Sequence, residues 1–206
     1  MVAARTTIHI IYGVPCAGKS TTALAFAHRR DIRTVIHTDY LREVQRHYVP
    51  RETVPVLARV THDAWELYGP PTPANIRAGF LDHVAAVFPA IQVVTDKLVS
   101  DGFDSVVEGV HFHGELIEIL RGQNRQADIR ATLLTVGTGE ELLRRAISKG
   151  HARTNGLPLK EWRENIPAML AIQEFLVADA EERDIDVTTA TEWRESWGLS
   201  DVRRWT

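Results

Sequence analysis

The sequence predicts an α/β fold, with a mostly parallel five-stranded sheet covered by helices on both faces. Short apolar runs of strand length alternate with helical patterns along the chain, as a parallel sheet with crossover helices requires. A glycine-rich turn joins the first apolar run to the first helix. The 206 residues are 44% hydrophobic and 25% charged, which fits a single domain over residues 1–206 with a substantial core.

In the first half of the chain, apolar periodicity and the positions of proline and glycine predict the helices and strands. The expected order is a strand at 8–12, a helix at 20–30, a strand at 34–37, a helix at 40–47, a proline-interrupted helical region at 55–68 and a long amphipathic helix at 73–101. Pro89 lies inside the last of these helices, so we expect it to kink or divide that helix.

The second half continues the alternation. The expected order is a strand at 105–107, a strand at 129–136, a helix at 139–149, an exposed loop at 150–158, a helix ending near residue 183 and a short strand at 185–188. The tail, 191–206, carries Trp193, Trp197 and Trp205 beside three arginines. We expect it to form a helix that packs back on the domain, with a dimer contact as the alternative.

The glycine-rich turn reads Gly-Val-Pro-Cys-Ala-Gly-Lys-Ser from residue 13 to residue 20, which fits the phosphate-binding pattern G-x-x-x-x-G-K-[ST]. Backbone N–H groups close around phosphate oxygens, the lysine reaches the β and γ phosphates, and the serine hydroxyl reaches Mg²⁺. A fortuitous glycine-rich turn is the alternative, but the strand before it and the helix after it favour ATP binding. The predicted nucleotide-binding residues are Gly13, Pro15, Cys16, Ala17, Gly18, Lys19, Ser20 and Thr21.

Two carboxylates follow neighbouring strands of the expected sheet. Asp39 comes directly after the second strand and Glu108 ends the third. In a phosphoryl-transfer site one acid orients or deprotonates the acceptor hydroxyl, and the other helps to hold Mg²⁺. We assign the first role to Asp39 and the second to Glu108, together with Ser20. The alternatives are a helix N-cap for Asp39 and a neighbouring backbone or arginine partner for Glu108.

Cationic side chains complete the candidate site. Arg42 and Arg46 lie four residues apart on one helix face, where they can bind an anionic acceptor or simply face solvent. Arg144 begins a group with Arg145, Lys149, His151 and Arg153, at the base of an expected short lid over 144–158. We assign Arg144 a catalytic role on phosphate, the alternative being stabilisation of a helix C-terminus.

His111 is expected to touch the substrate. It alternates with His113 after Glu108, but no cysteine or acidic cluster completes a zinc site. Cys16 is the only cysteine, so no intramolecular disulfide forms. The formal charge of −3 gives no reason to expect nucleic acid as the partner. No apolar run approaches the length that spans a bilayer and the N-terminus is unlike a signal peptide, so we expect a cytoplasmic protein without a membrane partner.

With these residues in hand, the chain resembles the 2-phosphoglycerate kinases, P-loop kinases of the nucleoside-kinase-like group. The segments that carry the resemblance are HTDYLREVQR from residue 37, VVEGVH from residue 106 and IQEFL from residue 172. The resemblance implies a P-loop kinase fold, ATP with Mg²⁺, and a small phosphorylated hydroxy acid as acceptor. The lid departs from the family pattern because 144–151 lacks an aromatic residue.

The sequence therefore predicts an ATP-dependent kinase that transfers the γ-phosphoryl group to a hydroxyl of a small anionic metabolite. Two alternatives stay open: a kinase for an uncharged acceptor such as an antibiotic or a nucleoside, and a nucleotide-binding regulatory module that does not catalyse transfer. Phosphorylation of a nucleic acid is disfavoured by the acidic net charge.

Overall fold

The computed structural model describes residues 5–148 and 159–199. The strands of this part of the chain form one sheet in the order β2-β3-β1-β4-β5. Their bounds are Thr7–Tyr12 for β1, Thr34–His37 for β2, Ser105–Gly109 for β3, Asp128–Thr135 for β4 and Asp186–Thr189 for β5. All four pairings are parallel, so the predicted sheet is confirmed.

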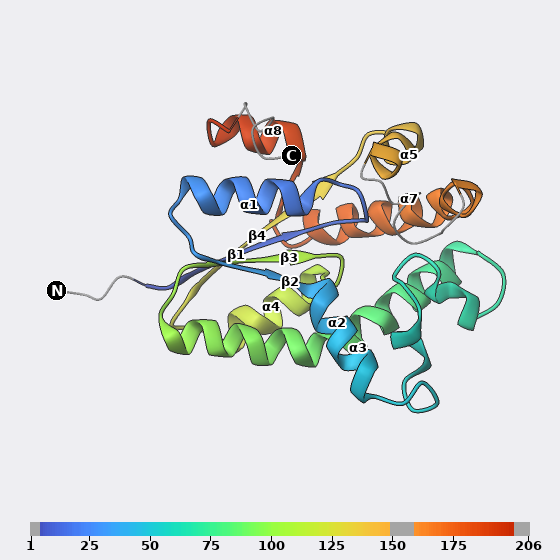
Figure 1. Ribbon diagram of the computed structural model, residues 1–206, viewed down its shortest axis with the longest axis horizontal. Coiled ribbons are helices and arrows are strands. Elements are labelled where there is room, and N and C mark those ends of the chain that lie inside the picture. The colour runs from blue at the N-terminus through green and yellow to red at the C-terminus, as the bar shows by residue number, and fades with distance from the viewer. Residues whose placement is uncertain (1–4, 149–158, 200–206) are drawn as a thin grey trace.

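Helices cover both faces of the sheet (Figure 1). Helices α1 and α8 lie on one face, while α3, α4 and α7 lie on the other. The α-helix bounds are Lys19–Arg29 for α1, Thr38–Tyr48 for α2, Pro73–Asp101 for α3, Gly114–Gln123 for α4, Gly139–Ser148 for α5, Leu159–Glu181 for α7 and Ala190–Ser196 for α8. Two short 3₁₀ helices, η1 at Pro55–Ala58 and η2 at Ala64–Leu67, follow α2.

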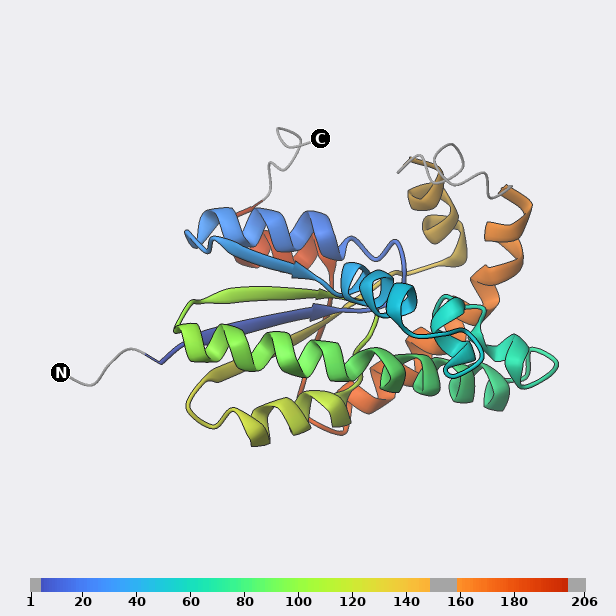
Figure 2. The ribbon, with the colours of Figure 1, turned by 60° about the horizontal axis from the view of Figure 1, so that its bottom comes forward.

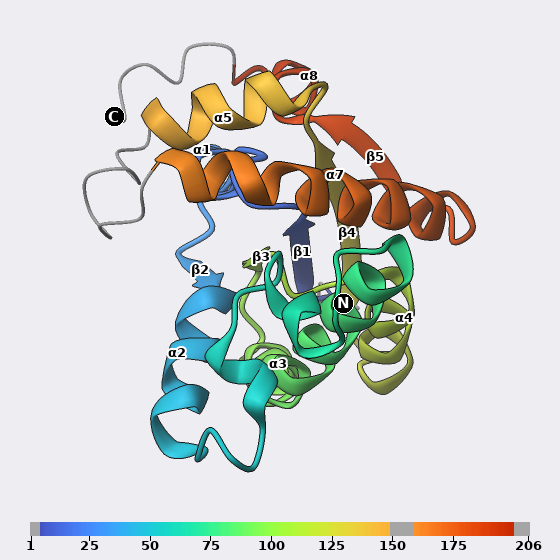
Figure 3. The same ribbon diagram turned by 90° about the vertical axis from the view of Figure 1, so that its right-hand side faces the viewer.

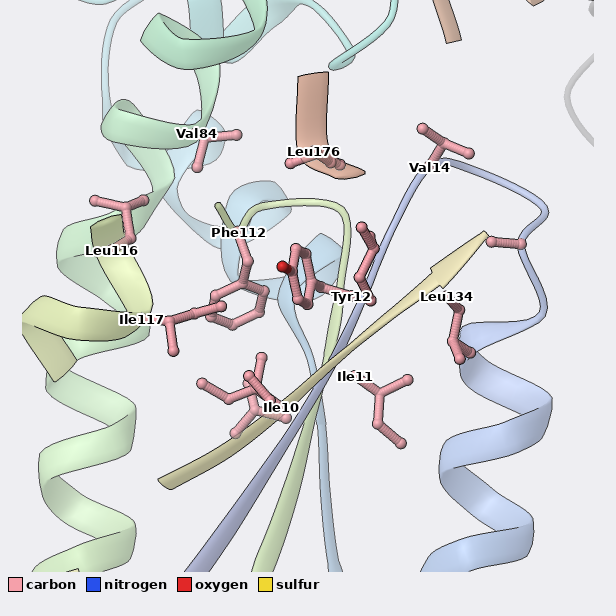
Figure 4. Packing of buried hydrophobic residues seen from close by; sticks show 14 of the residues in the cluster. Ile10, Ile11, Tyr12, Val14, Val84, Phe112, Leu116, Ile117, Leu134 and Leu176 are labelled. Carbon is pink, nitrogen blue, oxygen red and sulfur yellow. The ribbon is translucent and has the colours of Figure 1, made fainter. Parts of the chain in front are cut away.

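The core forms because alternate residues of the central strand face opposite sides of the sheet. On one side, the ring of His9 meets Phe26 of α1, with ring centroids 4.6 Å apart. On the other side, Tyr12 meets Phe112 at 6.3 Å. Figure 4 shows Tyr12, Phe112 and Ile117 on the side of α3. Burial on both faces explains why β1 reads as a nearly continuous apolar run.

The described part of the tail packs on the domain. Trp193 and Trp197 each contact Phe26 of α1 with ring centroids 4.9 Å apart, and Arg30 lies over the Trp197 ring. The helix expected at the start of the tail is therefore present as α8 and packs as predicted. The other tail residues, 200–206 with Trp205 among them, lie outside the described residues.

Helix α3 corrects two expectations. It runs unbroken through Pro89, so the expected division at that residue is wrong. Pro89 lies on an exposed face, where water can satisfy the carbonyl that loses its helical partner. The expectation that no segment is long enough to span a bilayer is also wrong. By length and composition alone, α3 could cross a membrane, because a stretch of 18 residues in it has a mean hydropathy of 1.4. Its buried side chains pack inside the fold, as those of a core helix do.

Other differences are local. Helix α4 was not expected, since its apolar residues give only a short and weak helical pattern. The expected helical region at 55–68 consists of η1 and η2, joined by an irregular segment. The expected loop at 150–158 lies outside the described residues, as does most of the expected lid.

The topology gathers the non-sheet segments at the carboxyl ends of the strands. Figure 2 shows α2, the η1–η2 region, α5 and the start of α7 at this end, and Figure 3 looks onto it. Ligands of parallel α/β sheets bind at this edge, because the loops that follow the strands meet there.

Candidate active site

The phosphate-binding loop, residues 13–18, joins β1 to α1. Gly13 has a φ of +143°, and a Cβ there would lie 2.3 Å from the carbonyl oxygen of Leu134 in β4. Glycine is therefore required where the loop leaves the sheet. Helix α1 begins at Lys19 without a side-chain cap, so the N–H groups of its first turn face the loop. This arrangement forms an anion site at a helix N-terminus.

Two further features of the loop fit phosphate binding. Lys19 is buried, and its Nζ donates a hydrogen bond to the Val14 carbonyl at 2.9 Å, so the ammonium group is held across the loop. Cys16 has a φ of +63°, a left-handed conformation that is uncommon for a residue with a Cβ. Such backbone strain is concentrated at ligand-binding segments.

Glu108 links the loop to the neighbouring strands. It lies beside Ile11 of β1 and His37 of β2 in the parallel register, and it is 4% exposed. Its Oε1 accepts a hydrogen bond from Ser20 Oγ at 2.8 Å and one from His37 Nδ1 at 2.5 Å. The carboxylate is therefore fixed by two donors, which are neither the backbone nor the arginine partner considered above.

Asp39 lies in the first turn of α2, where His37 is the N-cap residue, so Asp39 itself does not cap the helix. Its side chain is 64% exposed, and its Oδ1 lies 3.9 Å from His111 Nδ1. The same ring nitrogen is hydrogen-bonded to Thr38 Oγ1 at 2.7 Å. The carboxylate thus stands at the mouth of the site with His111 behind it.

One cavity of about 360 Å³ brings these groups together. It joins the phosphate-binding loop to α2, to the segment between η1 and η2, to the end of β3 and to the first turns of α7. Its lining residues are Pro15, Cys16, Lys19, Ser20, Asp39, Arg42, Val60, Thr61, His62, Glu108, Val110, His111 and Trp162. Size and lining suit a small ligand beside a bound nucleotide phosphate.

Some predicted site residues are placed elsewhere. Gly13, Ala17, Gly18 and Thr21 belong to the loop or to the first turn of α1 but do not line the cavity. Arg46 is bonded to Glu43 on the surface of α2 and also does not line it.

Two adjacent arginines of α5 have different surroundings, one facing solvent and the other contacting the phosphate-binding loop. Arg144 is exposed on that helix, whereas the next residue, Arg145, donates to the carbonyl of Ala17 at 3.0 Å. Lys149, His151 and Arg153 of the expected lid lie outside the described residues.

The cavity is positively charged at Lys19 and Arg42, while its histidines are neutral. Burial, followed by His83 and Arg42, lowers the pKa of His111 well below its usual value. Burial and the Arg42 charge lower the pKa of His62 to about 4. Burial likewise lowers the pKa of His83 to about 4. These imidazoles are therefore uncharged at neutral pH, and the arginine and lysine supply the attraction for an anion.

Sequence reasoning missed several residues at the site: His37, Thr61, His62 and Trp162. His37 could have been found, because it ends the strand beside Glu108. The others come from irregular segments or from helix positions that carry no motif.

Among the described residues, no group of three or more acidic, histidine or cysteine side chains could hold a metal ion. The pair of Ser20 Oγ and Glu108 offers oxygen ligands next to the phosphate-binding loop. Mg²⁺ prefers oxygen ligands and keeps several waters when it binds with phosphates, so this small donor set fits Mg²⁺.

No family model matches the chain. A 2-phosphoglycerate kinase from Methanopyrus kandleri is 33% identical over 183 residues, which are 87% of this chain and 55% of that protein. This chain is a relative of the 2-phosphoglycerate kinases. A mevalonate-3-phosphate 5-kinase from Thermoplasma acidophilum is 32% identical over 111 residues, which are 54% of each chain. The chain thus spans about half the length of these curated relatives.

The structural comparison agrees on the fold. A crystal structure of shikimate kinase from Bacteroides thetaiotaomicron superposes with a TM-score of 0.55 at 19% identity and covers 98% of this chain and 96% of that one. The P-loop kinase fold that the resemblance to 2-phosphoglycerate kinases implies is therefore confirmed.

Proposed function

We propose that this chain carries an ATP-dependent kinase that transfers the γ-phosphoryl group of ATP to a hydroxyl of a small anionic metabolite similar to 2-phosphoglycerate. One observation carries the proposal: a single cavity joins Lys19 and Ser20 of the phosphate-binding loop to Asp39 and Arg42. A nucleotide phosphate and an acceptor can therefore meet in one space. The similarity to 2-phosphoglycerate kinases supports the same acceptor class.

The loop and the first turn of α1 would bind the triphosphate through backbone N–H groups. Lys19 would reach the transferred phosphoryl group, moving from the Val14 carbonyl that it contacts here. The proposed nucleotide-binding residues are Gly13, Pro15, Cys16, Ala17, Gly18, Lys19, Ser20 and Thr21.

Ser20 and Glu108 would hold Mg²⁺, with His37 keeping the Glu108 carboxylate in place. When bound, Mg²⁺ neutralises the charge of the phosphate oxygens. Both residues lie in regular elements, the first turn of α1 and the inner strand β3, so they are positioned before a ligand arrives.

Asp39 would accept the proton of the acceptor hydroxyl. The hydroxyl oxygen forms a bond to the γ-phosphorus, the bond from that phosphorus to the bridging oxygen of ADP breaks, and the hydroxyl proton passes to the Asp39 carboxylate. Arg42 and His111 would bind the acceptor from α2 and from the end of β3. Arg46 would attract an anionic acceptor from the helix surface, outside the cavity.

We further propose a cytoplasmic enzyme with one kinase domain over residues 1–206, a lid over 144–158 and a tail over 191–206. Its partner would be the small acceptor, with no nucleic acid and no membrane. Size-exclusion chromatography with light scattering tests whether the tail supports a homodimer.

The assay that tests the function measures acceptor-dependent ADP release with phosphorylated and unphosphorylated hydroxy acids, followed by mass spectrometry of the product. Product formation from a phosphorylated hydroxy acid supports the proposal. Preference for neutral acceptors would replace it with a kinase for an antibiotic or a nucleoside. Tight ATP binding without any acceptor-dependent turnover would indicate a regulatory module.

Replacement of Arg42 by alanine should raise the KM for an anionic acceptor by about 10–100-fold, since a hydrogen bond to a charged group is worth about 1.5–3 kcal/mol. The KM for ATP should stay within about twofold. Arg46→Ala on the same helix is the matched variant, and its effect should be smaller because Arg46 lies outside the cavity. Equal acceptor KM values for Arg42→Ala and the unmodified protein would contradict the assignment of Arg42.

Adjacent arginines in α5 offer a second matched comparison. Arg145→Ala should weaken ATP binding by about 10-fold, because the loop loses a charged donor to the Ala17 carbonyl. Arg144→Ala tests the catalytic role expected for Arg144, and a fall in kcat at unchanged ATP affinity would support that role. Both variants are measured by titration with ATP and by steady-state kinetics. An unchanged ATP affinity in Arg145→Ala would refute the role of Arg145.

A further inference from the structure

Several buried polar atoms near the cavity have no hydrogen-bond partner within the described part of the protein. They are Arg42 Nε, His62 Nδ1, His83 Nδ1 and His111 Nε2. Arg42, His62 and His111 line the cavity, and the His83 ring stacks on His111 with centroids 5.2 Å apart. A buried polar atom without a partner costs free energy, so a group of them around one cavity indicates a polar ligand.

Protein contacts fix the orientation of this group. The Arg59 carbonyl accepts hydrogen bonds from Arg42 Nη1 at 3.0 Å and from His83 Nε2 at 3.1 Å. Arg42 Nη2 also donates to the Glu43 carboxylate, so both terminal nitrogens of the guanidinium are anchored, while its Nε–H remains for a ligand. Because His83 donates from Nε2, its Nδ1 carries the lone pair of a neutral ring.

His62 is held from two sides. The Trp65 Nε1–H donates to the His62 carbonyl at 3.1 Å, which fixes the backbone. The imidazole stacks on Trp162 of α7, with ring centroids 5.8 Å apart and an interplanar angle of 28°. A ring clamped in this way holds its nitrogens at set positions, as a specificity-determining residue must.

These three residues come from different segments: Arg42 from α2, His62 from the turn between η1 and η2, and His111 from the segment that follows β3. Donors on three separate segments can contact a ligand on more than one side. A tetrahedral phosphate, with oxygens on several sides, fits such donors better than a planar carboxylate does.

We propose that His62 binds a phosphate group carried by the acceptor, next to Arg42, and thereby selects phosphorylated acceptors over unphosphorylated ones. This inference rests on the proposed kinase function, which supplies the acceptor. An acceptor without the phosphate leaves His62 Nδ1 and Arg42 Nε without partners in a buried site and is bound more weakly for that reason.

The test compares two substitutions of His62. His62→Phe keeps an aromatic ring against Trp162 and removes both nitrogens, whereas His62→Asn restores a polar group near the position of Nδ1. His47→Phe, at an exposed position of α2 outside the cavity, is the matched control. Affinities for 2-phosphoglycerate and for glycerate are measured by calorimetry with a non-hydrolysable ATP analogue present, and thermal unfolding reports the integrity of each variant.

We expect His62→Phe to weaken binding of 2-phosphoglycerate by about 10–100-fold and binding of glycerate by less than about threefold. His62→Asn should recover part of the loss, and His47→Phe should behave as the unmodified protein. Equal weakening for both ligands, no weakening, or failure of the unmodified protein to bind 2-phosphoglycerate would overturn the proposal for His62. Selective binding of 2-phosphoglycerate that depends on His62, but without phosphoryl transfer, would support that proposal while refuting the kinase function.

Discussion

Replacing Lys19 by methionine should reduce kcat by about 10³-fold or more while leaving the fold intact. Lys19 is the cation of the phosphate-binding loop, and removal of a preorganised charge at a transferred group costs about 10²–10³ in rate even for a single donor. Methionine keeps the length and apolar character of the stem, so the buried site is filled. The measurement is ADP release at saturating acceptor, with the unfolding temperature recorded for each protein.

Lys97→Met is the control, because it makes the same substitution at a lysine outside the phosphate-binding loop. Lys97 is exposed on α3, is paired only with Asp101 among the described residues, and does not line the cavity. Its substitution should change neither kcat nor the unfolding temperature measurably, since exposed ion pairs contribute little. If Lys19→Met turned over as fast as Lys97→Met, the phosphate-binding role of the loop would have to be abandoned.

Replacing Gly109 by alanine should damage both stability and activity. A Cβ at this position would lie 1.7 Å from Thr38 Oγ1, in a fully buried contact between β3 and the start of α2. Thr38 must then move, which breaks its hydrogen bond to His111 and shifts the adjacent Asp39. Overpacking of a core typically costs about 1–3 kcal/mol, and displaced catalytic groups cost about 100-fold in rate.

Gly122→Ala provides the matched control, because a Cβ there meets no atom within 4 Å. Gly122 lies in α4, so this change should stabilise the protein by up to about 1 kcal/mol. In Gly109→Ala, the additional substitution Thr38→Ala removes the clashing oxygen and should restore part of the stability but not the activity. Denaturant unfolding and ADP release follow the two effects separately. A stable and fully active Gly109→Ala variant would show that the contact with Thr38 is dispensable.

Much of the fold could be predicted because parallel α/β sheets have a strong sequence signal. The strands are buried on both faces, so each appears as an apolar run, and the loop motif marked the junction of β1 and α1. Helix α4 was not predicted because ten residues with four closely spaced apolar positions do not establish a period. The continuity of α3 through Pro89 depends on tertiary packing, which the local rule for proline does not include.

The site was predicted only where a motif or a strand end marked it. Lys19, Ser20, Asp39, Arg42, Glu108 and His111 all line the cavity, although their roles await the tests above. His62 and Trp162 were missed because they meet only after the chain folds, a hundred residues apart, and neither position belongs to a motif. The choice between Arg144 and Arg145 depended on which face of α5 turns to the loop, and two adjacent helix positions cannot be separated by sequence alone.

The order of strands has a consequence for how the protein is made. The central strand β1 pairs with β3, which starts at Ser105, and with β4, which ends at Thr135. A ribosome therefore synthesises the phosphate-binding loop long before either neighbouring strand exists, and pairings between such distant segments form slowly. A nascent chain halted before residue 135 lacks the complete frame around β1 and should neither retain nucleotide nor resist proteases. The capacity to bind nucleotide thus arises later in translation than the motif itself, which precedes both neighbouring strands along the chain.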